Sequence, residues 1–227
     1  MLSAAEWEVL TVSLRVALIA VACSLPFAVG AAYALSRAFP GKSVLDAAVH
    51  LPLALPPVLT GFLLLLLLGR RAPIGAWLEH NFHVHLAFTM GGAALATAVM
   101  AFPFMVRAIR LSFEATDAHV FEAAAVLRAG PWDRFVSIAL PLAGPGVLAG
   151  AATAFAASLG EFGAVITFAA NIPGETQTLP LAIYAALQTP DGDAQALRLA
   201  GLSFALAIAS LAAAEALQRW SRARLKG

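Results

Sequence analysis

The chain has 227 residues, of which 61% are hydrophobic and 12% are charged, and its formal net charge is +1. Soluble domains carry roughly 45–50% apolar and about 25% charged residues, so a water-soluble fold of this length has too little interior to hide the apolar side chains. The basic residues are sparse and scattered, which argues against a nucleic-acid partner. We therefore expect an all-α, polytopic membrane protein in contact with lipid.

Five apolar stretches of the sequence are long enough to cross a membrane as helices, which takes about 20 residues each. Arg15 and Pro26 interrupt the first stretch. The fourth is expected to begin near Pro145, because Pro141 and Pro145 disfavour an unbroken helix from Phe135. Residues 1–227 then form a single transmembrane domain, with spans at about 9–36, 47–69, 86–106, 145–170 and 197–217.

Three prolines, Pro52, Pro56 and Pro57, interrupt the second stretch at membrane depth. A broken helix is tolerated there where its freed carbonyls face protein or a watery cavity. The prolines mark either a segment that lines a pathway and bends during gating, or a kink packed against neighbouring helices. Thr60 is placed to bond a freed carbonyl in both cases.

The orientation of the spans follows from the basic residues in short loops, which gather on the cytoplasmic side. With five spans, ten basic residues fall on one side, in the loops after the first and third spans and in the tail: Arg37, Lys42, Arg107, Arg110, Arg128, Arg134, Arg219, Arg222, Arg224 and Lys226. The other side holds Arg70 and Arg71, with Arg198 near a boundary. We expect the N-terminus outside and the C-terminus in the cytoplasm.

Residues 113–134 form the cytoplasmic region between the third and fourth spans. Asp117 is placed to cap a helix that starts near Ala118. The helix is rich in alanine, and Gly130 is expected to end it in a left-handed conformation before Pro131. A second short helix is expected from Trp132 to Leu140.

Two helices with sharp breaks are unusual between neighbouring spans, because loops between helices usually run about 2–8 residues. We therefore favour a protein-docking helix, with Phe121 and Leu127 as apolar anchors, over an ordinary connecting loop. On the opposite side of the membrane, Leu179–Leu187 is apolar but too short to span. It is expected to form a short helix across the outer mouth, either to meet a partner or as a passive plug.

The docking helix carries a pattern that resembles a known motif. Glu122-Ala123-Ala124, followed by Ile138 and Leu140-Pro141, resembles the EAA motif of bacterial ABC-importer permeases. The resemblance implies a coupling helix that inserts into a groove on a cytoplasmic ATPase. Arg128 stands where the motif usually has glycine, so the helix is expected to run slightly longer. The coupling residues implied are Phe121, Glu122, Ala123, Ala124, Arg128 and Gly130.

Further stretches are similar to the molybdate importer permeases over nearly the whole chain: FPGKSVLDAAVHLPLALPPVLTG, GRRAPIG, SLGEFGAVITFAANIPGETQTLP and YAALQTP. The sulfate and tungstate permeases share parts of this pattern. The resemblance implies a type I ABC-importer permease fold in the bacterial inner membrane, where the outside N-terminus expected from the basic residues would be periplasmic. It also implies an importer of molybdate that works by alternating access, built from a second copy of this chain, two ATPase subunits and a periplasmic molybdate-binding protein.

No phosphate-binding GxxxxGK[ST] loop occurs in the sequence, so the chain is not expected to hydrolyse ATP. ATP and Mg²⁺ would bind the partner ATPase, and this chain is expected to need no cofactor. His80, His83 and His85 lack a fourth ligand, so no metal site is expected. An ion channel or a membrane scaffold without an ATPase remains the alternative from another class, although neither would need the docking helix.

Two ionisable residues lie within the spans, and such residues usually face the bundle interior and pair. One hypothesis is an ion pair between Arg15 and Glu161. The alternatives are that Arg15 attracts the anion or reaches to the outer interface. Gly160 and Gly163, on either side of Glu161, suggest a close approach of helices. The candidates for the pathway or gate are therefore Pro56, Pro57, Thr60, Arg15, Glu161 and Gly163.

Overall fold

The computed structural model describes residues 3–224, and within that range all regular structure is helical. The helices are α1 (Ala4–Leu35), α2 (Lys42–Ala54), α3 (Pro57–Leu68), α4 (Pro73–Phe82), α5 (Met90–Glu114), α6 (Ala118–Val126), α7 (Pro131–Arg134), the π-helix η1 (Phe135–Ala139), α8 (Leu140–Leu142), α9 (Gly144–Leu159), α10 (Gly163–Ala169), α11 (Leu179–Leu187) and α12 (Asp193–Arg224). The expected all-α architecture is confirmed over these residues.

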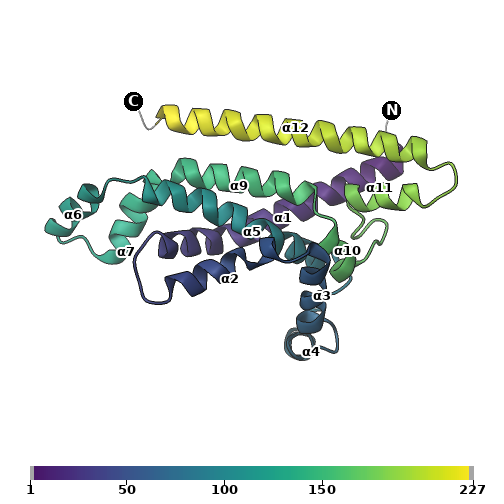
Figure 1. The fold of residues 1–227 in the computed structure, drawn as a ribbon, viewed down its shortest axis with the longest axis horizontal. Coiled ribbons are helices and arrows are strands. Elements are labelled where there is room, and N and C mark those ends of the chain that lie inside the picture. Colours follow the sequence, from purple (N-terminus) through teal and green to yellow (C-terminus); the bar gives the residue numbers. More distant parts are fainter. Residues whose placement is uncertain (1–2, 225–227) are drawn as a thin grey trace.

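The centre of the molecule is a bundle in which α5 packs between α1 and α9 along the long axis (Figure 1). Small side chains make up much of this contact. In lipid the hydrophobic effect does not drive helices together, so association depends on close packing, which small side chains allow. Those fully or almost fully buried include Ala17, Ala20, Ala28, Ala32, Ala93, Ala94, Ala96 and Ala101. The bundle core is therefore built from close backbone packing.

The first helix is fixed at its start by a reciprocal cap. Ser3 Oγ accepts from the Glu6 backbone N–H at 3.2 Å, and Glu6 Oε2 accepts from the Ser3 backbone N–H at 2.8 Å. This arrangement satisfies two of the free N–H groups of the first turn. The helix starts five residues before the expected boundary and continues through Pro26 to Leu35.

The second apolar stretch is a pair of helices, α2 and α3, with a bend of 114° between them. Leu55 is extended, with φ −91° and ψ 146°, because a residue that precedes proline is pushed away from helical geometry. Pro57 then occupies the first turn of α3, where a missing N–H removes no helical hydrogen bond. The bend directs α3 away from the bundle, with α4 at its far end (Figure 1).

A charge pair closes the corner between α3 and α4. Arg70 Nη2 lies 2.8 Å from Glu79 Oε1. The hydrogen bond from the Arg70 guanidinium holds the pKa of the Glu79 carboxyl below its usual range. The projecting arm thus has a defined shape outside the bundle.

The fourth apolar stretch is also divided. Residues 131–142 form a continuous helical run that bends by 65° into α9, and residues 160–162 then separate α9 from α10. The expected short helix from Trp132 to Leu140 is present, with a wider π turn over Phe135–Ala139. The single span expected at 145–170 is therefore two helices.

Three helices, α1, α5 and α12, are long and apolar enough to cross a membrane, and the number rises to five if each bent pair counts as one span. The outermost, α12, exposes large apolar side chains, as a helix in contact with lipid or another chain does: Leu197, Phe204, Ile208 and Leu211. The two ends of the chain lie at opposite ends of the long axis (Figure 1). Such an arrangement fits an odd number of crossings.

Candidate coupling surface and gate

Helix α6 lies at one extreme end of the molecule, beyond the ends of α5 and α1 (Figure 1). Asp117 Oδ1 accepts from the His119 backbone N–H at 3.0 Å, so the expected cap at the start of the helix is confirmed. The helix runs from Ala118 to Val126. It is a short, capped helix held outside the apolar bundle.

The two faces of α6 differ in a way that the sequence did not reveal. Phe121 is partly buried and packs against the bundle core of the same chain, and Ala124 is only 7% exposed. The outward surface includes Glu122, Ala123, Val126 and Leu127, of which the last two are 83% and 82% exposed. Of the two expected apolar anchors, Leu127 faces outward and Phe121 faces inward.

The end of α6 differs from the expectation. Arg128 itself is left-handed, with φ 59°, whereas Gly130 is extended, with φ −67° and ψ 163°, and precedes α7. The Ala129 N–H donates to the Ala124 carbonyl at 3.0 Å, which is the closing bond of a Schellman motif. The helix therefore does not run longer than the motif implies, and the prediction that Gly130 ends it is wrong.

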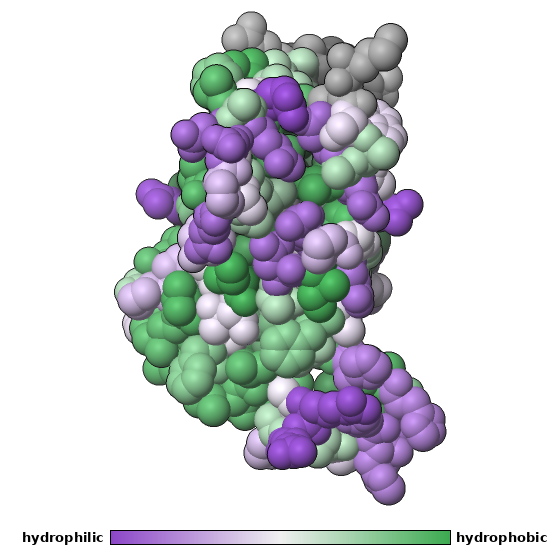
Figure 2. Space-filling model, turned by 90° about the vertical axis from the view of Figure 1, so that its right-hand side faces the viewer, coloured by the Kyte–Doolittle hydropathy of each residue, from purple (hydrophilic) through white to green (hydrophobic). Residues whose placement is uncertain are grey.

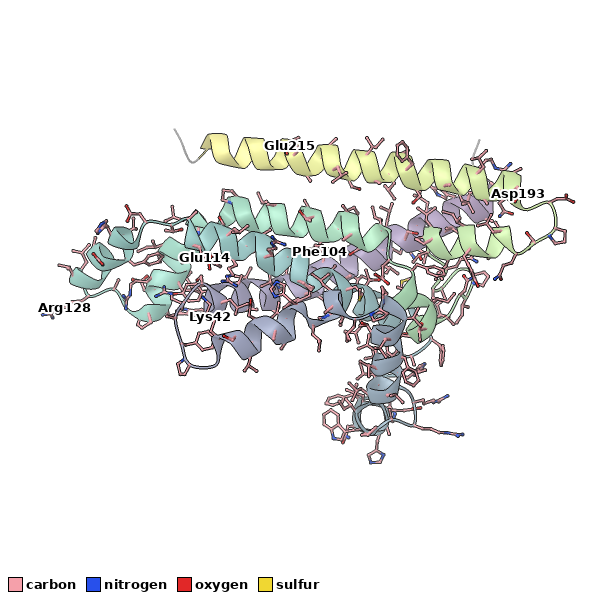
Figure 3. The ribbon with its side chains drawn as sticks, viewed as in Figure 1. Lys42, Phe104, Glu114, Arg128, Asp193 and Glu215 are labelled. Atoms are coloured by element: carbon pink, nitrogen blue, oxygen red, sulfur yellow. The ribbon has the colours of Figure 1, made fainter. Side chains whose placement is uncertain are left out.

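With the helix ended by the Ala129–Ala124 hydrogen bond, the Arg128 side chain can extend outward. Figure 3 shows Arg128 at the far tip of the molecule, directed away from the bundle. An arginine in the left-handed region carries a steric cost that glycine avoids. Residue 128 thus combines backbone strain with an exposed positive charge at the end of α6.

At the opposite half of the molecule, α3 and α10 cross closely through two glycines. A Cβ atom added at Gly163 would lie 2.7 Å from Pro57 Cβ, and one added at Gly61 would lie 2.6 Å from the Ala164 carbonyl oxygen. Only glycine fits at these positions without a shift of the neighbouring helix. The two helix breaks, at residues 55–56 and 160–162, therefore come together in space.

Two expected contacts at this crossing are wrong. Glu161 Oε1 accepts from the Ala164 backbone N–H at 2.9 Å and so caps α10. Arg15 is exposed on α1, and no ion pair within residues 3–224 joins it to Glu161. The Thr60 hydroxyl is buried and has no hydrogen-bond partner among residues 3–224, so it bonds no freed carbonyl there. The crossing gathers Pro57, Thr60, Glu161 and Gly163, but not Arg15.

A charged cluster that sequence reasoning missed joins α2 to α5. Arg110 Nη1 lies 2.9 Å from Asp46 Oδ1, and Arg110 Nε lies 2.8 Å from Glu114 Oε1. The Arg110–Glu114 contact has the i, i+4 spacing of helical pairs. Asp46 is 64 residues away in the sequence, so no local pattern signals the contact that ties the two helices.

At the end opposite α6, α11 lies as expected, over Leu179–Leu187. Its first N–H, that of Leu179, donates to the buried Ser13 Oγ of α1 at 2.7 Å, and Arg198 Nε of α12 donates to Glu6 Oε1 at 2.9 Å. Figure 2 looks onto this end, where hydrophilic side chains gather, with a second hydrophilic group on the projecting α4. Polar contacts therefore hold α1, α11 and α12 together at this end.

These features describe a helical protein with apolar spans, an external helix at one end and a pair of broken helices nearer the other. The model of the family described as "Binding-protein-dependent transport system inner membrane component" matches residues 7–226. The chain therefore belongs to the family of inner-membrane components of binding-protein-dependent transport systems. Members of this family are transport subunits.

Two relatives match this chain over nearly the full length of both proteins. The chain is 52% identical over 220 residues to the molybdenum transport system permease protein ModB of Escherichia coli K12, covering 96% of each. It is 47% identical over 221 residues to ModB of Haemophilus influenzae, covering 97% of this chain and 96% of the relative. The similarity to the molybdate permeases is thus confirmed over nearly the whole chain.

The chain is also similar to a sulfate permease in sequence and to a solved transporter in fold. The sulfate transport system permease protein CysT of Escherichia coli K12 is 37% identical over 195 residues, which cover 82% of this chain and 70% of the relative. A crystal structure of a bacterial alginate ABC transporter in complex with an alginate pentasaccharide-bound periplasmic protein superposes with a TM-score of 0.65 at 14% identity, covering 96% of this chain and 77% of that chain. This likeness establishes the fold.

Proposed function

We propose that the chain is the permease subunit of an ATP-driven importer of molybdate, coupled to a cytoplasmic ATPase through α6. The observation that carries the coupling role is the outward surface of α6, where Val126 and Leu127 are more than four-fifths exposed at the extreme end of the molecule. Exposed apolar side chains grouped on a protruding element mark a protein interface. The assignment of molybdate rests on the two ModB relatives.

A second copy of the chain is expected to complete the translocation pathway. One copy offers only half of a pathway wall, and closed two-fold symmetry is the commonest way to complete such an assembly. Closure of the two ATPase subunits on ATP would draw the two α6 helices together. The bundle would then tilt and change the α3–α10 crossing, which gives alternating access to the two sides.

The arrangement of the helices supports an orientation with the N-terminus in the periplasm and the C-terminus in the cytoplasm. The N-terminus lies at the end that holds α11, and the C-terminus at the end that holds α6 (Figure 1). Arg37 contacts Phe121 of α6, and Lys42 lies in the same half of the molecule as α6 (Figure 3). Basic residues at that end are expected on the cytoplasmic side. The hydrophilic end in Figure 2 would then meet the molybdate-binding protein.

A sulfate or tungstate permease is the nearest rival, since the sulfate permease relative shares 37% identity. The test is molybdate uptake in cells that lack their own molybdate permease, with this chain expressed together with its ATPase and binding protein. We expect uptake to recover and to resist a large excess of sulfate. Recovery of sulfate uptake in place of molybdate uptake would assign the chain to the rival anion.

A further inference from the structure

We infer that Arg37 seats the coupling helix on the membrane bundle by stacking between an aromatic ring of α1 and one of α6. The inference rests on the proposed coupling role of α6 and adds a positioning residue to it. Arg37 lies just beyond the end of α1, and nothing in the EAA resemblance points to it. Its role follows from three contacts of one guanidinium group.

The guanidinium of Arg37 joins two elements directly. Its carbon Cζ lies 4.8 Å from the centre of the Tyr33 ring and 5.3 Å from the centre of the Phe121 ring. Its Nη2 also donates to the Tyr33 hydroxyl at 2.6 Å. Both ring distances are within the range of about 6 Å at which a cation is attracted to an aromatic face. Arg37 therefore binds α6 to the inner end of α1.

The Tyr33 ring extends this contact to the rest of the inner end. Its centre lies 5.3 Å from that of Phe113, near the end of α5, and 4.6 Å from that of Phe135, at the start of η1. Ring pairs at these separations attract each other beyond simple burial. Four elements, α1, α5, α6 and η1, thus meet around Tyr33 and Arg37.

The cluster around Tyr33 and Arg37 lies between α6 and the bundle, so it can pass a displacement of α6 to α1 and α5. Phe121 is on the inward face of α6, opposite Val126 and Leu127, which are free to contact the ATPase. A displacement of α6 by the ATPase would reach α1 through the Phe121–Arg37 stack and α5 through Tyr33. Without the stack, α6 is expected to shift on its own, so that ATP hydrolysis continues while fewer anions are moved.

The test uses the complete transporter in proteoliposomes with the binding protein, and measures molybdate imported per ATP hydrolysed. Arg37→Gln and Phe121→Leu each remove the stack, and each is expected to lower this ratio by about two- to five-fold, the range that a cation–π contact at an exposed site supplies. The double variant is expected to be no lower than the lower single variant. Arg37→Lys keeps the cation and is expected to recover most of the ratio.

Arg107→Gln is the matched control, because Arg107 is an exposed arginine at the same end that makes none of these ring contacts. Its ratio is expected to equal that of the unaltered chain. An unchanged ratio in both Arg37→Gln and Phe121→Leu, or fully additive losses in the double variant, would overturn the inference and leave the proposed function standing. Failure of the unaltered chain to retain an ATPase would overturn both.

Discussion

Arg110 Nη1 contacts Asp46 Oδ1 at 2.9 Å, and this pair joins the start of α2 to the end of α5. Helix α5 leads directly to α6, and α2 leads to the bend before α3. The pair therefore ties the helix that precedes α6 to the helix that precedes the α3–α10 crossing. We expect α2 and α5 to move as one body.

This pair can be measured by a double-mutant cycle on Asp46→Asn and Arg110→Gln in the solubilised chain. Because both side chains are partly exposed, the coupling energy is expected to be about 0.5–1 kcal/mol. Thermal unfolding of the four variants provides the measurement. Additive losses would show that the two helices are held together by other contacts.

The outward surface of α6 is expected to hold the ATPase through apolar contact. Leu127→Asp should release the ATPase from the purified complex, because it places a charge within a surface that would otherwise be dehydrated. Copurification measures the result. Val84→Asp, a similar change at an exposed apolar residue before α5, is the control and should retain the ATPase.

If Leu127→Asp retains the full complement of ATPase, α6 is not the docking helix. Ala124 is a poor site for this experiment, even though it belongs to the EAA pattern. Its side chain is buried within the chain itself, so a larger residue there would disturb the packing of this chain before it met any partner.

The left-handed backbone at residue 128 gives a prediction on stability. Arg128→Gly removes the clash of the Cβ atom and should stabilise the chain by about 1 kcal/mol, seen as a higher thermal unfolding midpoint. Arg128→Ala keeps the Cβ atom and should give no such gain. Equal midpoints for the two variants would mean that the left-handed conformation carries no measurable strain.

The crossing of α3 and α10 should tolerate no side chain at its contact point. Gly163→Ala brings a methyl group against Pro57 and is expected to destabilise the chain by about 1–3 kcal/mol. Gly160→Ala is the matched control, because the nearest atom to an added Cβ there is 3.8 Å away. Comparable unfolding midpoints for the two variants would contradict the close crossing.

Features set by short-range chemistry were predictable from the sequence. The cap at Asp117, the bounds of α11 and the helix break near Pro56 each follow from a few adjacent residues. The 114° angle between α2 and α3 did not follow, because prolines permit a bend without fixing its direction. That direction depends on the glycines through which α3 meets α10.

Contacts between distant residues were predicted poorly. The Arg15–Glu161 pair was inferred from the usual need of a charge in a span for a partner, but a backbone N–H three residues away satisfies Glu161. The contact of Asp46 with Arg110 has no sequence signal, since both residues also suit a solvated loop end. The EAA resemblance located α6 but not which of its faces is buried.

The central claim is that this chain couples ATP hydrolysis to the movement of molybdate through α6. The most direct test is uptake of labelled molybdate by proteoliposomes that contain the permease, its ATPase and the binding protein, measured with ATP, without ATP, and with the Leu127→Asp permease. If α6 couples the two processes, uptake occurs only with ATP and only with the unaltered chain. Equal uptake without ATP, or with Leu127→Asp, would contradict it.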